Sequence, residues 1–198
     1  MGILNVGFFG GSFDPPHSGH EEIANHSIDL LGLDVLYVCP TGGIVGNKQM
    51  VSSSYEKRLQ MAKMAFSEIE KTKVVAWERG EKTSYTYNTL SELVHREKMS
   101  INVFLIMGMD SFLNISSWKE YEKLFLLANI VVFPREGIPK TLINSTVDEF
   151  KQTGISLEKV VFATNNIADI SSTEVRKNKT IKNKHVSPAV LDIYLKDQ

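Results

Sequence analysis

Short apolar runs alternate along the chain with segments whose apolar residues recur at helical spacing. The apolar runs, which we expect to form strands, cover 3–9, 35–39, 74–77, 101–107, 129–133 and 159–163. The helical stripes comprise Ile23, Ser27, Leu30 and Leu31, then Leu59, Met61, Ala62, Ala65 and Phe66, and finally Leu90, Leu93 and Val94. Strands that alternate with helices in this way predict a parallel sheet covered by helices on both faces.

This alternation predicts an α/β fold, a Rossmann-like doubly wound parallel sheet with C-terminal helices. In such sheets, ligands bind beyond the carboxyl ends of the strands. The chain has no internal repeat and no Pro/Gly-rich linker, so we expect residues 1–198 to form one domain. Residues 140–157 are more polar and less patterned than the rest, and we expect them to be an insertion.

Three helix starts are marked by capping residues. Ser18 and Ser171 each precede a glutamate by three residues, at Glu21 and Glu174, which is the spacing of a capping box. Ser187 stands before a proline, which is favoured at the first position of a helix. Each start leaves backbone N–H groups pointing out of a helix N-terminus.

The composition excludes several classes of protein. Among 198 residues, 22 Lys and Arg balance 23 Asp and Glu, so the net charge of −1 offers no basic field for nucleic acid. The longest apolar stretch, 124–133, is interrupted by Asn129 and is too short to cross a bilayer. Cys39 is the single cysteine, which excludes an internal disulfide and fits a buried thiol in a reducing compartment. With no signal-peptide pattern at the N-terminus, we expect a cytoplasmic protein.

The segment after the first predicted strand has the composition of an anion-binding turn. Gly10 and Gly11 allow a sharp turn close to a ligand, and a capped helix follows. His17 and His20 are three residues apart at the start of that helix, so both imidazoles can project to the same side and donate to phosphate oxygens.

Two simpler interpretations of this segment exist. A Gly-Gly-Ser turn can be only a turn, and a His-x-x-His pair also occurs in zinc sites. Zinc needs at least three protein ligands, and beyond the two histidines only Asp14 is near enough in sequence to serve, so we expect no metal held by protein side chains.

A second candidate phosphate site lies near the end of the chain. Ser172 and Thr173 present hydroxyls and backbone donors at a helix start, and Arg176 follows one turn later as a bidentate donor. The lysines at 179–184 are expected to be solvated.

Both segments resemble motifs of one superfamily. Residues 11–20, Gly-Ser-Phe-Asp-Pro-Pro-His-Ser-Gly-His, resemble the signature of the nucleotidyltransferases that carry the H-x-G-H motif, and 170–176, Ile-Ser-Ser-Thr-Glu-Val-Arg, resemble their I-S-S-T-x-x-R motif. Residues 83–90, 107–111 with Trp118, and 133–137 are similar to segments of one branch, the nicotinate- or nicotinamide-mononucleotide adenylyltransferases. The resemblance extends from Val6 to Tyr194.

The resemblance implies roles for individual residues. His17, His20 and Arg176 would act on the phosphates being transferred. The other residues implied at the ATP site are Gly10, Gly11, Ser12, Phe13, Lys48, Gly108, Asp110, Ser171, Ser172 and Thr173. The residues implied at the mononucleotide site are Thr86, Trp118 and Arg135. Spacing alone also allows Asp110 to be a helix cap and Trp118 to be a core residue.

One loop departs from the family pattern. Many bacterial members have Pro-Pro-His-Lys after the second strand, whereas this chain has a glycine-rich stretch at 40–48 that lacks the histidine. Lys48 is the candidate for the corresponding lysine. Arg58, in the following helix, is interpreted as an ordinary surface cation and is left out of the site.

The sequence thus predicts an enzyme that joins the AMP part of ATP to a pyridine mononucleotide and releases pyrophosphate. Mg²⁺ is expected to accompany ATP, bound mainly by phosphates and water. Two alternatives remain, a phosphopantetheine-type adenylyltransferase and a non-catalytic nucleotide sensor. The choice between nicotinate and nicotinamide, and whether the protein forms a homo-oligomer, are left open by the sequence.

Overall fold

The computed structural model describes residues 2–43, 51–80, 85–96, 100–135, 137–164, 167–168 and 170–196. The strands are β1 (Leu4–Gly11), β2 (Val35–Pro40), β3 (Thr72–Val74), β4 (Ile101–Gly108), β5 (Asn129–Phe133) and β6 (Val160–Phe162). The helices are α1 (Ser18–Leu31), α2 (Tyr55–Ala65), α3 (Thr86–Arg96), α4 (Met109–Leu113), the 3-10 turn η1 (Ile115–Ser117), α5 (Tyr121–Leu127), α6 (Lys140–Gln152), α7 (Ser172–Lys177), α8 (Lys179–His185) and α9 (Pro188–Leu195).

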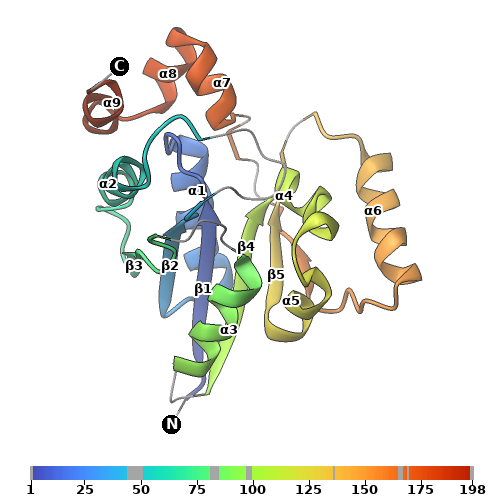
Figure 1. The fold of residues 1–198 in the computed structure, drawn as a ribbon. Coiled ribbons are helices and arrows are strands. Elements are labelled where there is room, and N and C mark those ends of the chain that lie inside the picture. Colours follow the sequence, from blue (N-terminus) through green and yellow to red (C-terminus); the bar gives the residue numbers. More distant parts are fainter. Residues whose placement is uncertain are drawn as a thin grey trace.

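Within these residues the strands form one sheet of order β3-β2-β1-β4-β5-β6, and every neighbouring pair is parallel. This is the doubly wound order in which the chain reverses direction across the sheet between β1 and β4. The predicted α/β Rossmann-like sheet is therefore confirmed. All strands point toward the end of the molecule where α7, α8 and α9 gather (Figure 1).

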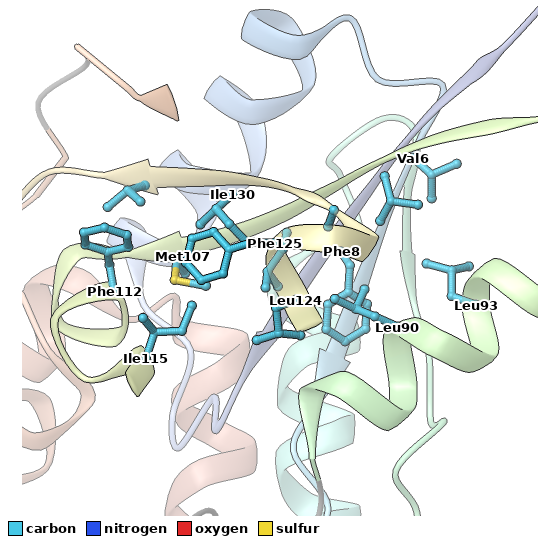
Figure 2. Packing of buried hydrophobic residues seen from close by; sticks show 14 of the residues in the cluster. Val6, Phe8, Leu90, Leu93, Met107, Phe112, Ile115, Leu124, Phe125 and Ile130 are labelled. Atoms are coloured by element: carbon cyan, nitrogen blue, oxygen red, sulfur yellow. The ribbon is translucent and has the colours of Figure 1, made fainter. Parts of the chain in front are cut away.

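Alternation along β1 divides the core between the two faces of the sheet. Val6 and Phe8 face a cluster that includes Leu90 and Leu93 of α3 and Phe125 of α5, as Figure 2 shows. On the opposite face, Phe9, Ile106 and Val131 pack with residues of α1 and α2. Gly7 shares this second face, where an added Cβ would lie 2.6 Å from Leu33 Cδ1, so a larger residue there would require the surrounding side chains to shift.

A third cluster lies beyond the carboxyl ends of the strands, and we call it the terminal core. Its buried members are Met61, Ile170, Val175, Val186, Val190, Ile193 and Tyr194. They join α2 to α7 and α9, so the C-terminal helices pack on α2 rather than on the face of the sheet (Figure 1).

Two sequence predictions about the extent of helices and strands were wrong. Residues 140–157 are not an unpatterned insertion, because 140–152 form α6 with Phe150 fully buried against Phe112, Tyr121 and Phe125. The strand expected at 74–77 ends at Val74 in the structure. There Trp77 packs its ring on Phe8 and Tyr37 instead of continuing the sheet.

Other sequence predictions hold. Cys39 is fully buried. Ser171 and Ser187 cap α7 and α9 as expected. In the described part of the chain, no helix combines the length and apolar character needed to cross a bilayer.

Candidate active site

A cavity of about 750 Å³ opens at the carboxyl ends of β1 and β4, where the sheet reverses direction. It collects residues from both motifs and from the segments between them. The predicted site residues that line it are Gly10, Gly11, Ser12, His17, His20, Thr86, Gly108, Asp110, Trp118, Arg135, Ser171, Ser172, Thr173 and Arg176. Lys48 lies outside the described residues. Phe13 is fully buried and does not line the cavity, because its ring packs on Phe9 and Phe66.

The two histidines meet at the start of α1. Their ring centroids are 3.8 Å apart, and the backbone N–H of His17 donates to Nδ1 of His20 at 3.2 Å. The cap of this helix is His17 and not Ser18 as the sequence predicted, because His17 has an extended backbone (φ −148°, ψ 170°) and the helix begins at Ser18. The hydroxyl of Ser18 instead lies 3.0 Å from Nδ1 of His185 in α8.

Both imidazoles are neutral near pH 7. Burial lowers the pKa of His20 to about 3, and burial, followed by the charge of His20, also lowers the pKa of His17. Since Nδ1 of His20 accepts a hydrogen bond, the hydrogen-bond pattern assigns its proton to Nε2. His20 is therefore arranged as a neutral N–H donor whose tautomer is fixed by the backbone of His17.

Gly19, between the histidines, brings α1 close to the segment before α7. A Cβ at this position would lie 3.3 Å from the backbone oxygen of Ala168 and 3.3 Å from Cγ2 of Ile170. The glycine of the H-x-G-H motif therefore permits the N-terminal and C-terminal motifs to pack directly against each other.

Arg176 and its helix contact the N-terminal motif through hydrogen bonds. Nη1 of Arg176 donates to the backbone oxygen of Asp14 at 2.6 Å, and Nη2 donates to Oγ1 of Thr173 at 3.2 Å. The hydroxyl of Ser172 donates to the backbone oxygen of Pro15 at 3.0 Å. The two motifs predicted to hold the triphosphate are thus held on one side of one cavity.

Arg135 forms ion pairs with two acidic side chains. Its Nη1 lies 2.7 Å from Oδ2 of Asp110, and its Nη2 lies 2.9 Å from Oε2 of Glu174. The cap of α4 is Gly108, so the alternative role of Asp110 as the helix cap is excluded. The pairing of Arg135 with Glu174 could not be found from sequence, because it joins the end of β5 to α7 across 39 positions.

Trp118 and Thr86 form another part of the cavity lining. Trp118 packs partly on the core and also lines the cavity, so both of its proposed roles are compatible with its position. Thr86 is the first residue of α3. The two neighbours of Thr86 in sequence each pack against a lysine. Lys119 lies 4.5 Å from the ring centre of Tyr85, and Lys123 lies 5.3 Å from the ring centre of Tyr87. These contacts connect the start of α3 to the segment that follows Trp118.

Two buried charged residues were missed by the sequence analysis. Arg58 is only 1% exposed and lines the cavity, so its interpretation as a surface cation was wrong. It lies on the same helical stripe as Met61 and Ala62, three and four residues on, and that position was the available signal. Glu78, also buried, lines the cavity near Arg58 and had no sequence signal.

The residues that the structure describes include no group of three or more His, Cys, Asp or Glu side chains able to hold a metal ion.

The fold and the cavity define a nucleotidyltransferase of the cytidylyltransferase-like family, whose model matches residues 8–178, and the chain belongs to this family. A probable nicotinate-nucleotide adenylyltransferase of Idiomarina loihiensis is 31% identical, with 94% of this chain and 93% of the relative covered. One of Geotalea daltonii is 32% identical, with 98% and 97% covered. The chain thus belongs to the nicotinate-nucleotide adenylyltransferases.

Solved structures agree on the fold. Plasmodium falciparum nicotinic acid mononucleotide adenylyltransferase complexed with NaAD superposes with a TM-score of 0.75 at 20% identity. The alignment covers 98% of this chain and 95% of the Plasmodium chain. The same Plasmodium protein complexed with APC gives a TM-score of 0.68.

Proposed function

We propose that this protein transfers the adenylyl group of ATP to the 5′-phosphate of nicotinate mononucleotide. A phosphate oxygen of the mononucleotide attacks the α-phosphorus, the bond from that phosphorus to the β-bridging oxygen breaks, and pyrophosphate leaves. The attacking oxygen is already an anion, so no side chain has to remove a proton from it. The protein has to align the two substrates and stabilise the charge on the leaving group.

The donors for that charge come from the two joined motifs. His20 supplies a neutral Nε2–H donor, and Arg176 supplies a guanidinium already oriented by Asp14 and Thr173. His17, the hydroxyls of Ser172 and Thr173, and the turn at 10–12 complete the proposed phosphate site. Each donor aimed at developing charge contributes about 10²–10³-fold in rate.

The proposed mononucleotide site uses other residues of the lining. Trp118 would stack on the pyridine ring, and Thr86 would contact the ring substituent. At the proposed ATP site, Asp110, two residues after Gly108, would accept hydrogen bonds from a ribose diol, with its carboxylate oriented by Arg135. Arg135 also adds positive charge where the acceptor, itself an anion, has to bind.

ATP is proposed to enter as its Mg²⁺ complex. Mg²⁺ prefers oxygen ligands and keeps several waters, which suits an ion carried on the phosphates rather than one held by a protein cluster. It would neutralise part of the charge on the triphosphate and the leaving pyrophosphate.

The convergence of His17, His20 and Arg176 on one cavity carries this proposal. The test incubates the protein with ATP and Mg²⁺ plus either nicotinate mononucleotide, nicotinamide mononucleotide or phosphopantetheine, and detects the adenylylated product by mass spectrometry. We expect nicotinate adenine dinucleotide with stoichiometric pyrophosphate. Product from phosphopantetheine alone, or from none of the three, would overturn the proposal.

A matched pair of variants guards against a contaminating activity. His20→Ala is expected to lower turnover at least about tenfold, because a donor to the phosphates is lost. His95→Ala, an exposed histidine of α3, should turn over at the wild-type rate.

A further inference from the structure

The guanidinium of Arg58 lies between the turns that follow β1 and β2. Its Nη1 donates to the backbone oxygen of Ser12 at 2.9 Å, and its Nη2 donates to those of Thr41 at 2.8 Å and Gly42 at 3.2 Å. One side chain thus satisfies three carbonyl groups from two turns, and Ser12, Thr41 and Gly42 all line the cavity. The planar guanidinium presents its donors in these directions in a fixed geometry, which the flexible ammonium of lysine does not.

Glu78 holds the same turn from its other side. Its Oε2 accepts the backbone N–H of Gly42 at 3.0 Å, while its Oε1 accepts the hydroxyl of Thr89 at 2.8 Å. Gly42 is therefore held at its carbonyl by Arg58 and at its amide by Glu78. Thr89 lies one turn after Thr86 in α3, so the network runs from the turn after β1 to the helix that begins at the proposed mononucleotide site.

The position of Arg58 would suit an apolar residue, since Met61 and Ala62 on the same stripe are fully buried. Burying a cation is costly unless hydrogen bonds compensate for its lost hydration. In the described part of the chain, the hydrogen bonds of the two Nη atoms of Arg58 all go to backbone carbonyls of the two turns. The charged side chain therefore serves to hold these two turns in place.

We propose that Arg58 and Glu78 form a clamp that fixes the turn after β2 relative to the phosphate turn after β1 and to α3. Arg58 and Glu78 are positioning residues in this proposal, which rests on the proposed function. The clamp aligns the two substrates, because the three segments it joins line one cavity. A displacement of about 1 Å between reacting groups costs about 10²-fold in rate.

The first test is Arg58→Lys, which keeps the charge and loses the fork. We expect kcat to fall about 10–100-fold, while the dissociation constants of ATP and mononucleotide, each measured alone by calorimetry, change less than about threefold. Arg79→Lys is the matched control, because Arg79 forms an exposed ion pair with Glu56 and should keep wild-type values. A kcat within about twofold of wild type, or loss of binding without loss of kcat, would overturn the clamp.

Amide hydrogen exchange tests whether the clamp holds its turns in place, and it does not require the enzyme to turn over. The Gly42 amide, bonded to Glu78, and the Thr41 amide, bonded to Gly11, should exchange at least about tenfold faster in Arg58→Lys than in wild type. Unchanged exchange at both amides would overturn the clamp even if kcat fell. A wild-type protein that makes no dinucleotide would contradict the proposed function alone, since exchange still tests the clamp.

Glu78→Gln provides the same readouts if Arg58→Lys does not fold. Glutamine keeps the shape of the side chain and can accept from only one of Gly42 and Thr89. We expect faster Gly42 exchange and a lower kcat. When both single variants fold, the double variant should be no worse than the poorer single one, because the two residues act as a unit. Fully additive losses would overturn the clamp.

Discussion

Arg176 Nη1 donates to the backbone oxygen of Asp14 at 2.6 Å, which joins a helix near the end of the chain to the turn before its first helix. The same guanidinium donates to Thr173, one turn earlier in α7. These contacts fix the fork before any phosphate arrives, so little orientation entropy remains to be lost on binding.

Replacing Arg176 by lysine tests the value of this orientation. Lysine retains the charge and has no fork to reach both Asp14 and Thr173, so we expect kcat/KM for ATP to fall about 10–100-fold. Steady-state kinetics measures the effect, with the exposed neighbour substitution Lys177→Ala as the control. Wild-type kinetics in Arg176→Lys would remove Arg176 from the proposed site.

The lowered pKa values of His17 and His20 make stability depend on pH. Below about pH 6.5 the unfolded chain protonates His20, while the folded protein, in which its pKa is lowered to about 3, does not. The contribution of His20 to the free energy of unfolding is therefore complete above about pH 6.5. It is lost as the pH falls, by up to about 1.4 kcal/mol per pH unit. Urea unfolding at about pH 7 and at about pH 4.5 measures the free energy of unfolding at each pH. Between these two values, the free energy of unfolding should fall less for His20→Gln than for wild type. Equal losses would contradict the assignment.

Gly19→Ala should separate the two motifs. The new Cβ would meet the backbone oxygen of Ala168 at 3.3 Å, and a backbone atom cannot turn away as a side chain can. We expect a loss of about 1–3 kcal/mol in the free energy of unfolding, measured by denaturant titration. A lower turnover should accompany it, because His17 and Arg176 lie on the two segments that would be pushed apart. Wild-type stability and turnover would mean that the contact relaxes without cost.

Phe150→Ala tests the unexpected helix α6. The ring of Phe150 is fully buried and meets Phe112, Tyr121 and Phe125, so its removal should lower the free energy of unfolding by about 3–5 kcal/mol. Turnover of the folded variant should remain near wild type, because the residues of α6 do not line the cavity. Leu142→Ala, half exposed on the same helix, should change stability by less than about 0.5 kcal/mol.

The fold and the motif residues could be predicted from sequence because their signals are local. Buried parallel strands are continuous apolar runs, and the phosphate motifs are short segments at strand ends and helix starts. The helix at 140–152 was missed because its buried stripe contains Thr146 and few apolar residues. Its burial depends on Phe112 and Phe125, which come from other elements.

The clamp and the Arg135 bridge could not be predicted for the same physical reason. Arg58 reaches Ser12 across 46 positions, and Arg135 reaches Glu174 across 39, so no spacing rule relates the partners. Residue type alone does not distinguish a buried arginine from an exposed one. Only its place on an apolar stripe distinguishes it, and that signal is weak in a short helix.

The terminal core gives the last helix influence over chemistry that it never touches. Val175, which is fully buried there, immediately precedes Arg176, and Val190, Ile193 and Tyr194 of α9 pack in the same cluster. Natural variation at these three positions should therefore be restricted as tightly as at the cavity itself. A fusion partner or a shortened C-terminus that disturbs α9 would be expected to weaken the enzyme from a distance, with nothing altered at the reacting atoms.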